Sequence, residues 1–165
     1  MNQEGNNQNK NKKTMETKTL NANKKIARQS FEANSKGDFD TLEKITDTKK
    51  FKMHFPGYKN PLNFEEAKKM GMGYNTAFPD AKVTIENQIA EGDYVVTRVI
   101  YTGTNKGEFQ GMPASGKKTK SSGMTLQHIV NGRIVEEWDE FDALGMMQQI
   151  GAIPEMEKME KEEKW

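Results

Sequence analysis

The sequence predicts an α+β domain in which the helices come first and the strands follow. Before Pro79 the apolar residues recur every three or four positions, as they do along one face of a helix. After Pro79 the period changes to two, and β-branched and aromatic residues become frequent, which indicates strands. Helices grouped ahead of strands are typical of a domain whose helices cover one face of an antiparallel sheet.

The chain has 165 residues, which is enough for one hydrophobic core. We expect a single domain over residues 21–154, between a disordered tail over 1–20 and a charged tail over 155–165. The N-terminal segment is rich in Asn and Lys and has no apolar periodicity, so it buries too little to offset the entropy of ordering. The C-terminal segment has oppositely charged residues at helical spacing and is expected to be a frayed helix or a tail.

Three helices are expected before Pro79. The first covers about 22–35 and closes with a Lys-Gly pair, a common helix end. The second follows at once, with Asp38 as its N-cap. The third begins at Asn63, and Glu66 three residues later completes a capping-box pattern.

The strands are marked by alternation and by the turns between them. A short alternating stretch over 51–55 precedes a Pro-Gly turn, ahead of the third helix. The later strands are expected over 83–89, 94–103, 119–130 and 133–142. The segment 104–118 holds three Gly and one Pro and is expected to be a long loop at the rim of a pocket, or a lid over it.

The turn of the last hairpin contains Asn131 and Gly132, and its register is open. A two-residue type I′ loop pairs Val130 with Arg133. A three-residue loop, with Gly132 in the left-handed position of a G1 bulge, pairs Ile129 with Arg133 instead. A change of one residue reverses the faces of a strand, so this choice decides which side chains lie together.

The three-residue loop is favoured because it gathers the apolar side chains of both strands on one face. That face then holds Met124, Leu126, Ile134 and Trp138, together with His128 and Asp142. In this register Glu137 and Asp139 belong to a charged outer face that meets solvent.

Composition narrows the classes of function. The chain carries 25 basic and 24 acidic residues, a formal charge of +1, whereas a nucleic-acid surface needs a concentrated basic face. It has no Cys, and its two His lack the tight spacing of metal ligands, so we expect no metal site. No apolar run approaches the length of a membrane span and no signal peptide is evident, so we expect a cytoplasmic protein with neither nucleic acid nor membrane as partner.

Several segments, in order along the chain, resemble the SnoaL-like polyketide cyclase and ester cyclase proteins. They are GDFDTLEKI, HFPG, AFPD, AEGD, GEF, and EEW followed by LGMMQQ, within residues 22–154. The resemblance implies the nuclear-transport-factor-like cone, in which a strongly curved, mainly antiparallel sheet surrounds an internal pocket and three N-terminal helices close it. It also implies a homodimer.

The resemblance further implies a reaction without cofactors. In the polyketide cyclases of this family a pocket aspartate near the end of the last strand is the general acid/base of an aldol ring closure, and Asp142 matches it. The implied protein is a polyketide-cyclase-like or isomerase-like enzyme acting on an apolar, carbonyl-bearing small molecule. The alternatives are a non-catalytic module that binds such a molecule and a dimeric interaction domain.

The candidate catalytic residues are Asp142 and His128. A carboxylate in apolar surroundings has a raised pKa, which suits proton transfer near neutrality, and Asp142→Asn is expected to keep the fold and abolish turnover. Asp142 is also a good N-cap for the segment that follows it, and the two roles do not exclude each other. The candidate substrate-binding residues are His54, Trp138, Tyr74, Met124, Tyr101 and Phe31.

Overall fold

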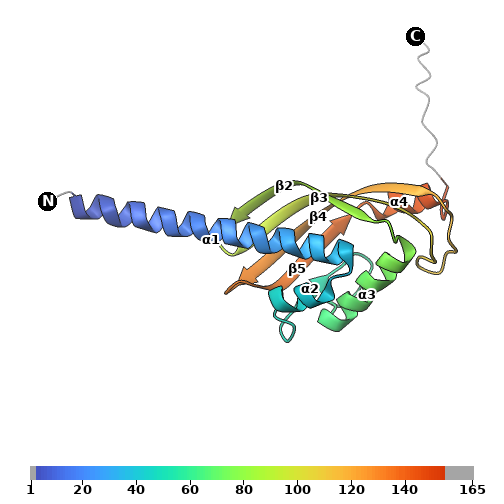
Figure 1. The fold of residues 1–165 in the computed structure, drawn as a ribbon, viewed down its shortest axis with the longest axis horizontal. Helices are drawn as coiled ribbons and strands as arrows, with labels where there is room; N and C mark the ends of the chain where they lie inside the picture. Colours follow the sequence, from blue (N-terminus) through green and yellow to red (C-terminus); the bar gives the residue numbers. More distant parts are fainter. Residues whose placement is uncertain (1–2, 155–165) are drawn as a thin grey trace, which may run out of the picture.

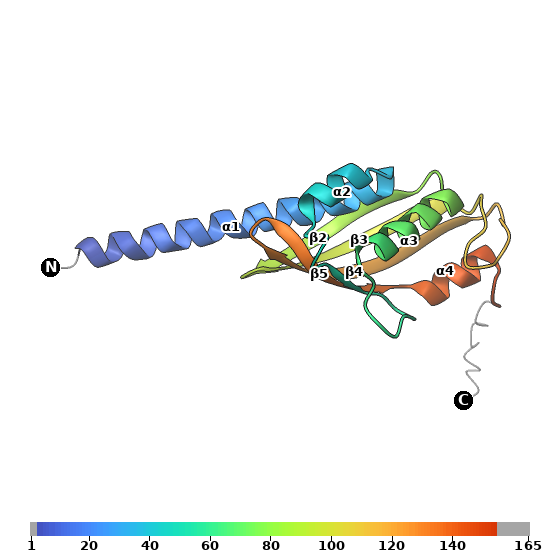
Figure 2. The same cartoon turned by 90° about the horizontal axis from the view of Figure 1, so that it is seen from below.

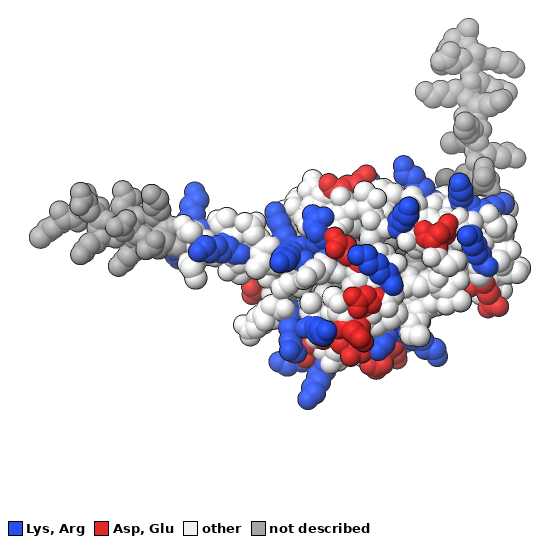
Figure 3. Space-filling model, viewed as in Figure 1, with Lys and Arg blue, Asp and Glu red and all other residues white. Residues whose placement is uncertain are grey.

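A computed structural model of the chain describes residues 3–154. The charged segment 155–165, expected to be a frayed helix or a tail, lies outside the described residues. Basic and acidic side chains are interspersed on the face of the described body seen in Figure 3.

The described residues form an open, mixed sheet with helices over one face (Figure 1). The helices are α1 (Gln3–Lys36), α2 (Phe39–Ile45), α3 (Phe64–Ala77) and α4 (Ala143–Ile150), and the strands are β1 (Lys52–His54), β2 (Lys82–Glu91), β3 (Tyr94–Thr104), β4 (Lys118–Val130) and β5 (Arg133–Phe141). The sheet order is β1-β5-β4-β3-β2, with β1 parallel to β5 and the other neighbours antiparallel. Helices α1, α2 and α3 cover one face and α4 lies at one end of the sheet (Figure 2). The predicted α+β class is confirmed.

The predicted helix caps are confirmed for the second and third helices. Asp38 accepts a hydrogen bond from the backbone N of Thr41 at the start of α2 (3.1 Å). At the start of α3, Asn63 and Glu66 form both halves of a capping box, at 3.0 and 2.8 Å. These side chains satisfy backbone N–H groups that have no partner inside the first turn of a helix.

Helix α1 begins at Gln3, much earlier than the expected start near residue 22. The structure therefore has helix over 3–21, where a disordered segment was expected. Figure 1 shows this half of α1 projecting from the body, whereas the half that packs on the sheet carries the buried residues Ala27 and Phe31. Extending an anchored helix adds one hydrogen bond per residue without a new nucleation step, so a polar segment can continue it.

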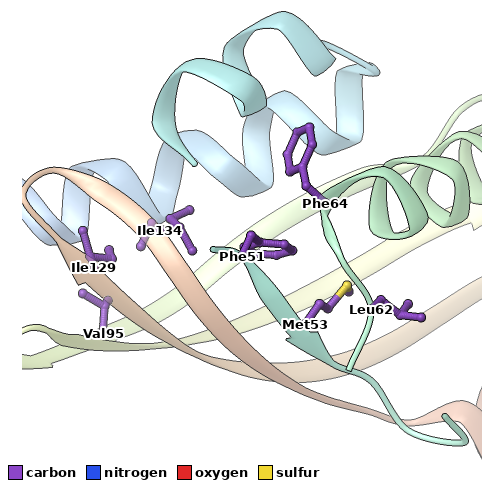
Figure 4. Packing of buried hydrophobic residues seen from close by; sticks show 8 residues of the cluster. Phe51, Met53, Leu62, Phe64, Val95, Ile129 and Ile134 are labelled. Atoms are coloured by element: carbon purple, nitrogen blue, oxygen red, sulfur yellow. The ribbon is translucent and has the colours of Figure 1, made fainter. Parts of the chain in front are cut away.

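Two apolar clusters hold the helices to the sheet. The larger one contains Ala27, Phe51, Met53, Leu62, Phe64, Val95, Ile129 and Ile134, which lie between the helices and the sheet in Figure 4. The smaller one contains Ala77, Phe78, Met146 and Ile150, from α3, its C-cap and α4. The smaller cluster fixes the end of the sheet where the last strand meets the last helix.

The favoured register of the last hairpin is wrong. The turn has two residues, with Asn131 and Gly132 at positive φ (50° and 76°), as a type I′ turn requires. Val130 therefore pairs with Arg133, and Ile129 pairs with Ile134. This tight turn leaves both isoleucines buried in the larger apolar cluster.

One extra residue then interrupts the hairpin and reverses the faces of β5. After the Ile129–Ile134 pair the next partners are His128 and Glu136, so Val135 is a β-bulge. Leu126 and Trp138 share a face, as the favoured register required, but they are direct partners and their face is the one away from the helices. We call the helix-covered face the inner face and the opposite one the outer face.

Candidate functional site

A cavity of about 370 Å³ lies between the helices and the inner face of the sheet. This volume is within the usual range for small-molecule sites. Most of its wall is apolar, and the aromatic side chains that line it are Phe31, Phe39, Phe51, Phe55, Tyr58, Phe64, Tyr74, Tyr101, Phe109 and Phe141. The wall therefore suits a ligand that is largely hydrocarbon.

One part of the wall is polar, and β4 and β5 supply most of it. Thr125 and Gln127 of β4 lie directly opposite Asp139 and Glu137 of β5. Because side chains alternate between the faces of a sheet, all four belong to the inner face. Ser30 of α1 joins them from the helix layer, and we call these five residues the acidic end of the cavity.

Hydrogen bonds connect the members of the acidic end. The amide Nε2 of Gln127 donates to Ser30 Oγ and to Glu137 Oε2, both at 3.0 Å. The hydroxyl of Thr125 donates to Asp139 Oδ1 at 2.5 Å. Two buried acceptors in this network, Gln127 Oε1 and Asp139 Oδ2, have no hydrogen-bond partner among the described residues.

The surroundings of the Glu137 and Asp139 carboxyl groups favour their protonated forms. Burial raises the pKa of Glu137, the negative charge of Asp139 raises it further, and the hydrogen bond from Gln127 opposes both effects. Burial also raises the pKa of Asp139, where the hydrogen bond from Thr125 lowers it and the charge of Glu140 raises it. Neighbouring carboxyls in this situation titrate together, and burial favours a proton on the pair.

Two tyrosines beside the acidic end keep their protons. Burial raises the pKa of Tyr101, and so do the charges of Asp139, Tyr74 and Glu137. Burial alone raises the pKa of Tyr74 to about 12. Their rings meet edge to face with centroids 6.4 Å apart, so the cavity wall has two neutral hydroxyl groups, of which that of Tyr101 is close enough to the carboxyl pair to feel its charge.

Three of the predicted substrate-binding residues line this cavity. They are Phe31 on α1, Tyr74 on α3 and Tyr101 on β3. The predicted apolar stripes of the helices and the alternation of β3 placed these side chains on the correct face.

The predicted catalytic residues and Met124 lie elsewhere. The side chain of Asp142 caps α4 and accepts a hydrogen bond from the backbone N of Gly145 at 2.8 Å, and Asp142 does not line the cavity. His128 lies on the outer face, where its ring stacks on Tyr94 with centroids 4.4 Å apart. Met124 is exposed on the same face. His128 and Met124 lie on the outer face because they alternate along β4 with Thr125 and Gln127, which face inward.

His54 and Trp138 come together, but outside the cavity. Their rings stack with centroids 5.0 Å apart and planes 4° from parallel, and His54 Nε2 is 2.8 Å from Glu136 Oε1. They line a separate hollow of about 220 Å³ with the turn over 55–61. The predicted association of Trp138 with an apolar pocket on the inner face is therefore wrong.

The structure also brings together residues that were not expected to belong to a site. Glu137 and Asp139, expected to face solvent, line the cavity, and Gln127, Thr125 and Ser30 surround them. One sequence signal bears on them, since small and polar residues at alternate positions along β4 mark the strand's cavity-facing side. The bulge that turns the carboxyls inward leaves no comparable signal.

Metal sites and membrane-spanning helices are two further features to consider in the described residues. Within the described residues no group of three or more His, Cys, Asp or Glu side chains could hold a metal ion. No helix in this part of the chain is long and apolar enough to cross a membrane.

Most of the chain matches a known protein family. The family model described as SnoaL-like polyketide cyclase matches residues 24–150, which include every strand and the whole cavity wall. The chain belongs to the SnoaL-like polyketide cyclase family. A search of curated protein sequences gives no match.

Solved structures of SnoaL-like proteins share the fold. Wild-type IdmH of Streptomyces antibioticus, provisionally named a polyketide cyclase, is 27% identical with a TM-score of 0.71, covering 78% of this chain and 98% of its own. A provisionally named polyketide cyclase of Acidithiobacillus ferrooxidans is 30% identical, with a TM-score of 0.69 and coverage of 78% and 94%. A SnoaL-like protein of Jannaschia sp. CCS1, also named provisionally, is 25% identical, with a TM-score of 0.75 and coverage of 82% and 95%.

Proposed function

We propose that this SnoaL-like protein is a cofactor-independent enzyme that performs acid–base chemistry beside the carbonyl group of an apolar small molecule, as a cyclase or an isomerase. The observation that carries the proposal is the carboxyl pair of Glu137 and Asp139. The pair lies on one face of β5, at the polar end of an otherwise apolar cavity.

The proposed mechanism assigns a different protonation state to each carboxyl. Asp139, hydrogen-bonded to Thr125, is the ionised base that removes a proton from the carbon next to the carbonyl. Glu137 keeps the shared proton and delivers it to the carbonyl oxygen as the C–H electron pair becomes the C=C bond of an enol. Glu137 then takes back the enol proton as the carbonyl re-forms. If Asp139 returns its proton to the opposite face of the carbon, or to another carbon of a conjugated system, the outcome is isomerisation; if the carbon adds to a second carbonyl whose oxygen takes the proton from Asp139, the outcome is aldol cyclisation.

The neighbouring side chains have supporting roles in this proposal. The neutral hydroxyl groups of Tyr74 and Tyr101 are hydrogen-bond donors for an oxygen that gains negative charge. Phe31 supplies apolar surface for the body of the substrate. Asp142 and His128 have no part in the reaction, because they lie outside the cavity.

Proton exchange tests this function without knowledge of the natural substrate. Apolar cyclic and aromatic ketones are incubated with the protein in D₂O, and deuterium at the carbon beside the carbonyl is followed by NMR. We expect catalysed exchange with at least one ketone that fits the cavity. Glu137→Gln and Asp139→Asn should each lower the exchange rate about 100-fold or more, the usual range for a general acid or base.

Two further variants control this experiment. Glu136→Gln changes a carboxyl of the same strand on the outer face and should leave exchange unchanged. Asp142→Asn should also retain exchange, since Asn caps helices as well as Asp does. If Asp142→Asn loses exchange while Glu137→Gln keeps it, the acid–base assignment proposed here is wrong.

A non-catalytic binding module is the second candidate. It is favoured by the largely apolar wall, which suits retention of a ligand without any reaction. Binding of the ketones by the wild-type protein, without exchange above the rate in buffer, would select this candidate.

We also propose that the protein is a homodimer whose copies meet through the outer face of the sheet. Support comes from the exposed apolar side chains of that face, Ile89, Tyr94 and Met124. Such an interface leaves the cavity of each copy on its own inner face.

A further inference from the structure

The acidic end of the cavity has more hydrogen-bond acceptors than donors. Both N–H groups of the Gln127 amide are used, and the hydroxyls of Thr125 and Ser30 donate to Asp139 and to the backbone O of Ala27. Gln127 is only 1% exposed, yet its Oε1 has no partner. Asp139 Oδ2 is in the same situation. A buried acceptor without a partner is unfavourable, so a ligand that brings donors to this end is favoured.

The charged groups around the cavity leave the carboxyl pair without a positive partner. The other titratable side chains that line the cavity are Lys68, Lys82, Tyr58, Tyr74, Tyr101, Glu108 and Glu140. Lys68 forms an ion pair with Glu43 at 2.7 Å. Among the described residues, no basic side chain contributes to the pKa of Glu137 or Asp139. The cavity therefore has an unbalanced negative charge at one end.

Aromatic rings make up much of the wall of the same cavity. Phe31, Tyr74, Tyr101 and Phe141 line it, and the faces of such rings attract cations. A protonated amine would supply both the N–H donors and the positive charge that the acidic end lacks. A neutral alcohol would supply a donor only, and a carboxylate would be repelled.

We propose that the acidic end binds the ammonium group of an apolar amine, whose hydrocarbon body lies in the aromatic part of the cavity. The inference rests on the unpartnered acceptors, the carboxyl pair and the apolar wall, and it does not require that the protein be an enzyme. Where the proposed acid–base reaction also holds, such amines inhibit it, because an ammonium group favours two ionised carboxylates and displaces the proton that Glu137 would deliver.

Three probes with one carbon skeleton test the inference by calorimetry. They are 1-naphthylmethylamine, 1-naphthylmethanol and 1-naphthoic acid, which present a cation, a neutral donor and an anion. We expect the amine to bind at least about 10-fold more tightly than the alcohol, and the acid to bind most weakly. Amine affinity should rise between about pH 6 and about pH 8, with proton release seen as a buffer-dependent binding enthalpy, because the pair ionises on binding.

Matched variants locate the binding site. Glu137→Gln and Asp139→Asn should each reduce the preference for amine over alcohol to about threefold or less, while alcohol binding shows that the cavity is intact. Glu136→Gln, on the outer face of the same strand, should keep the full preference. Equal binding of amine and alcohol by the wild type, no amine binding at about 1 mM, or a preference that survives both cavity variants would each overturn the inference.

The outcome is independent of the proposed reaction. Amine binding without ketone exchange would leave this inference standing and reject the enzyme. Ketone exchange that the amine does not inhibit, together with equal binding of amine and alcohol, would support the enzyme and reject the amine-binding inference.

Discussion

Glu137 and Asp139 show how surroundings change two ordinary carboxyl groups. Their spacing of two residues along a strand is common and by itself implies no chemistry. On the inner face they lose contact with bulk water and lie near each other, and both effects favour the protonated form. Hydrogen bonds from Gln127 and Thr125 oppose those effects, so the pair can both hold and release a proton.

The raised pKa of Glu137 predicts that the stability of the protein falls as the pH rises from about 5 to about 8. The unfolded chain releases this proton near the ordinary Glu pKa of about 4.3, whereas the folded chain retains it to higher pH. The stabilisation is therefore complete below that pH and is lost as the pH rises through the folded-state pKa. The Glu137→Gln variant cannot ionise at this position, so its free energy of unfolding should not fall for this reason as the pH rises. Relative to the wild type, its free energy of unfolding should increase by about 1–3 kcal/mol between about pH 5 and pH 8.

Urea denaturation across that pH range measures the effect. Glu32→Gln, at an exposed carboxyl of α1 outside the cavity, is the control, and its stability curve should run parallel to that of the wild type. A Glu137→Gln curve parallel to the wild type would show that Glu137 ionises normally in the folded protein.

Single residues were predictable where one local rule decides their position. Phe31, Tyr74 and Tyr101 follow apolar periodicity, and they line the cavity as expected. Asp142 satisfied two rules at once, since it stands where the family resemblance puts a pocket aspartate and where a helix needs a cap. The structure bears out the cap, which depends only on the adjacent backbone.

The structural elements differ in how much of their geometry is local. Helices α2 and α3 begin where their caps predicted, because a cap acts within one turn. The last hairpin turns where its Asn-Gly pair predicted. Its register was mispredicted, because the Val135 bulge depends on the burial of Ile129 and Ile134 against other elements. The start of α1 was also missed, since a polar helix without a packed face has no periodicity to detect.

The loop over 105–117 is fixed to the end of α3, and two glycines test this attachment. The backbone N of Gly107 donates to Ala77 O at 3.1 Å, and a Cβ at Gly107 would lie 2.7 Å from Thr76 O. Gly107→Ala should therefore destabilise the protein by about 1–3 kcal/mol. Gly73→Ala, at an open position within α3, should stabilise it by about 0.5–1 kcal/mol.

Thermal denaturation of both variants gives the comparison. The same substitution should have opposite effects at two sites in or beside one helix. A neutral Gly107→Ala would mean that the loop can move away from α3 at little cost, and that it is not a fixed part of the cavity wall.

At the scale of the whole molecule, the outer face of the sheet is suited to a second copy of itself. Ile89 is 66% exposed, Met124 46% and Tyr94 42%, and Val96, Leu126 and Trp138 lie among them. One end of this face carries Lys82 and Lys120, and the other carries Glu91 and Glu136. A two-fold axis through the centre would place the basic end of one copy against the acidic end of the other.

Light scattering after size-exclusion chromatography tests this dimer. The wild type should have twice the 18.8 kDa mass of one chain. Met124→Lys, in the middle of the outer face, should shift the mass to that of one chain by adding a charge at the interface. Met72→Lys, at an equally exposed methionine on α3, should leave the dimer intact. A wild type with the mass of one chain would rule out the dimer at that concentration.

The bulge at Val135 has a consequence for how this cavity can change. Along β5 the side chains that face inward are set by the number of residues after the turn as well as by their identity. If the two strands paired without the bulge, Glu136 would lie opposite Gln127 and Trp138 opposite Thr125, so Trp138 would take the place of Asp139 in the wall. The one extra residue in β5 thus decides whether two carboxyl groups lie opposite Gln127 and Thr125, or one carboxyl group and an indole ring lie there.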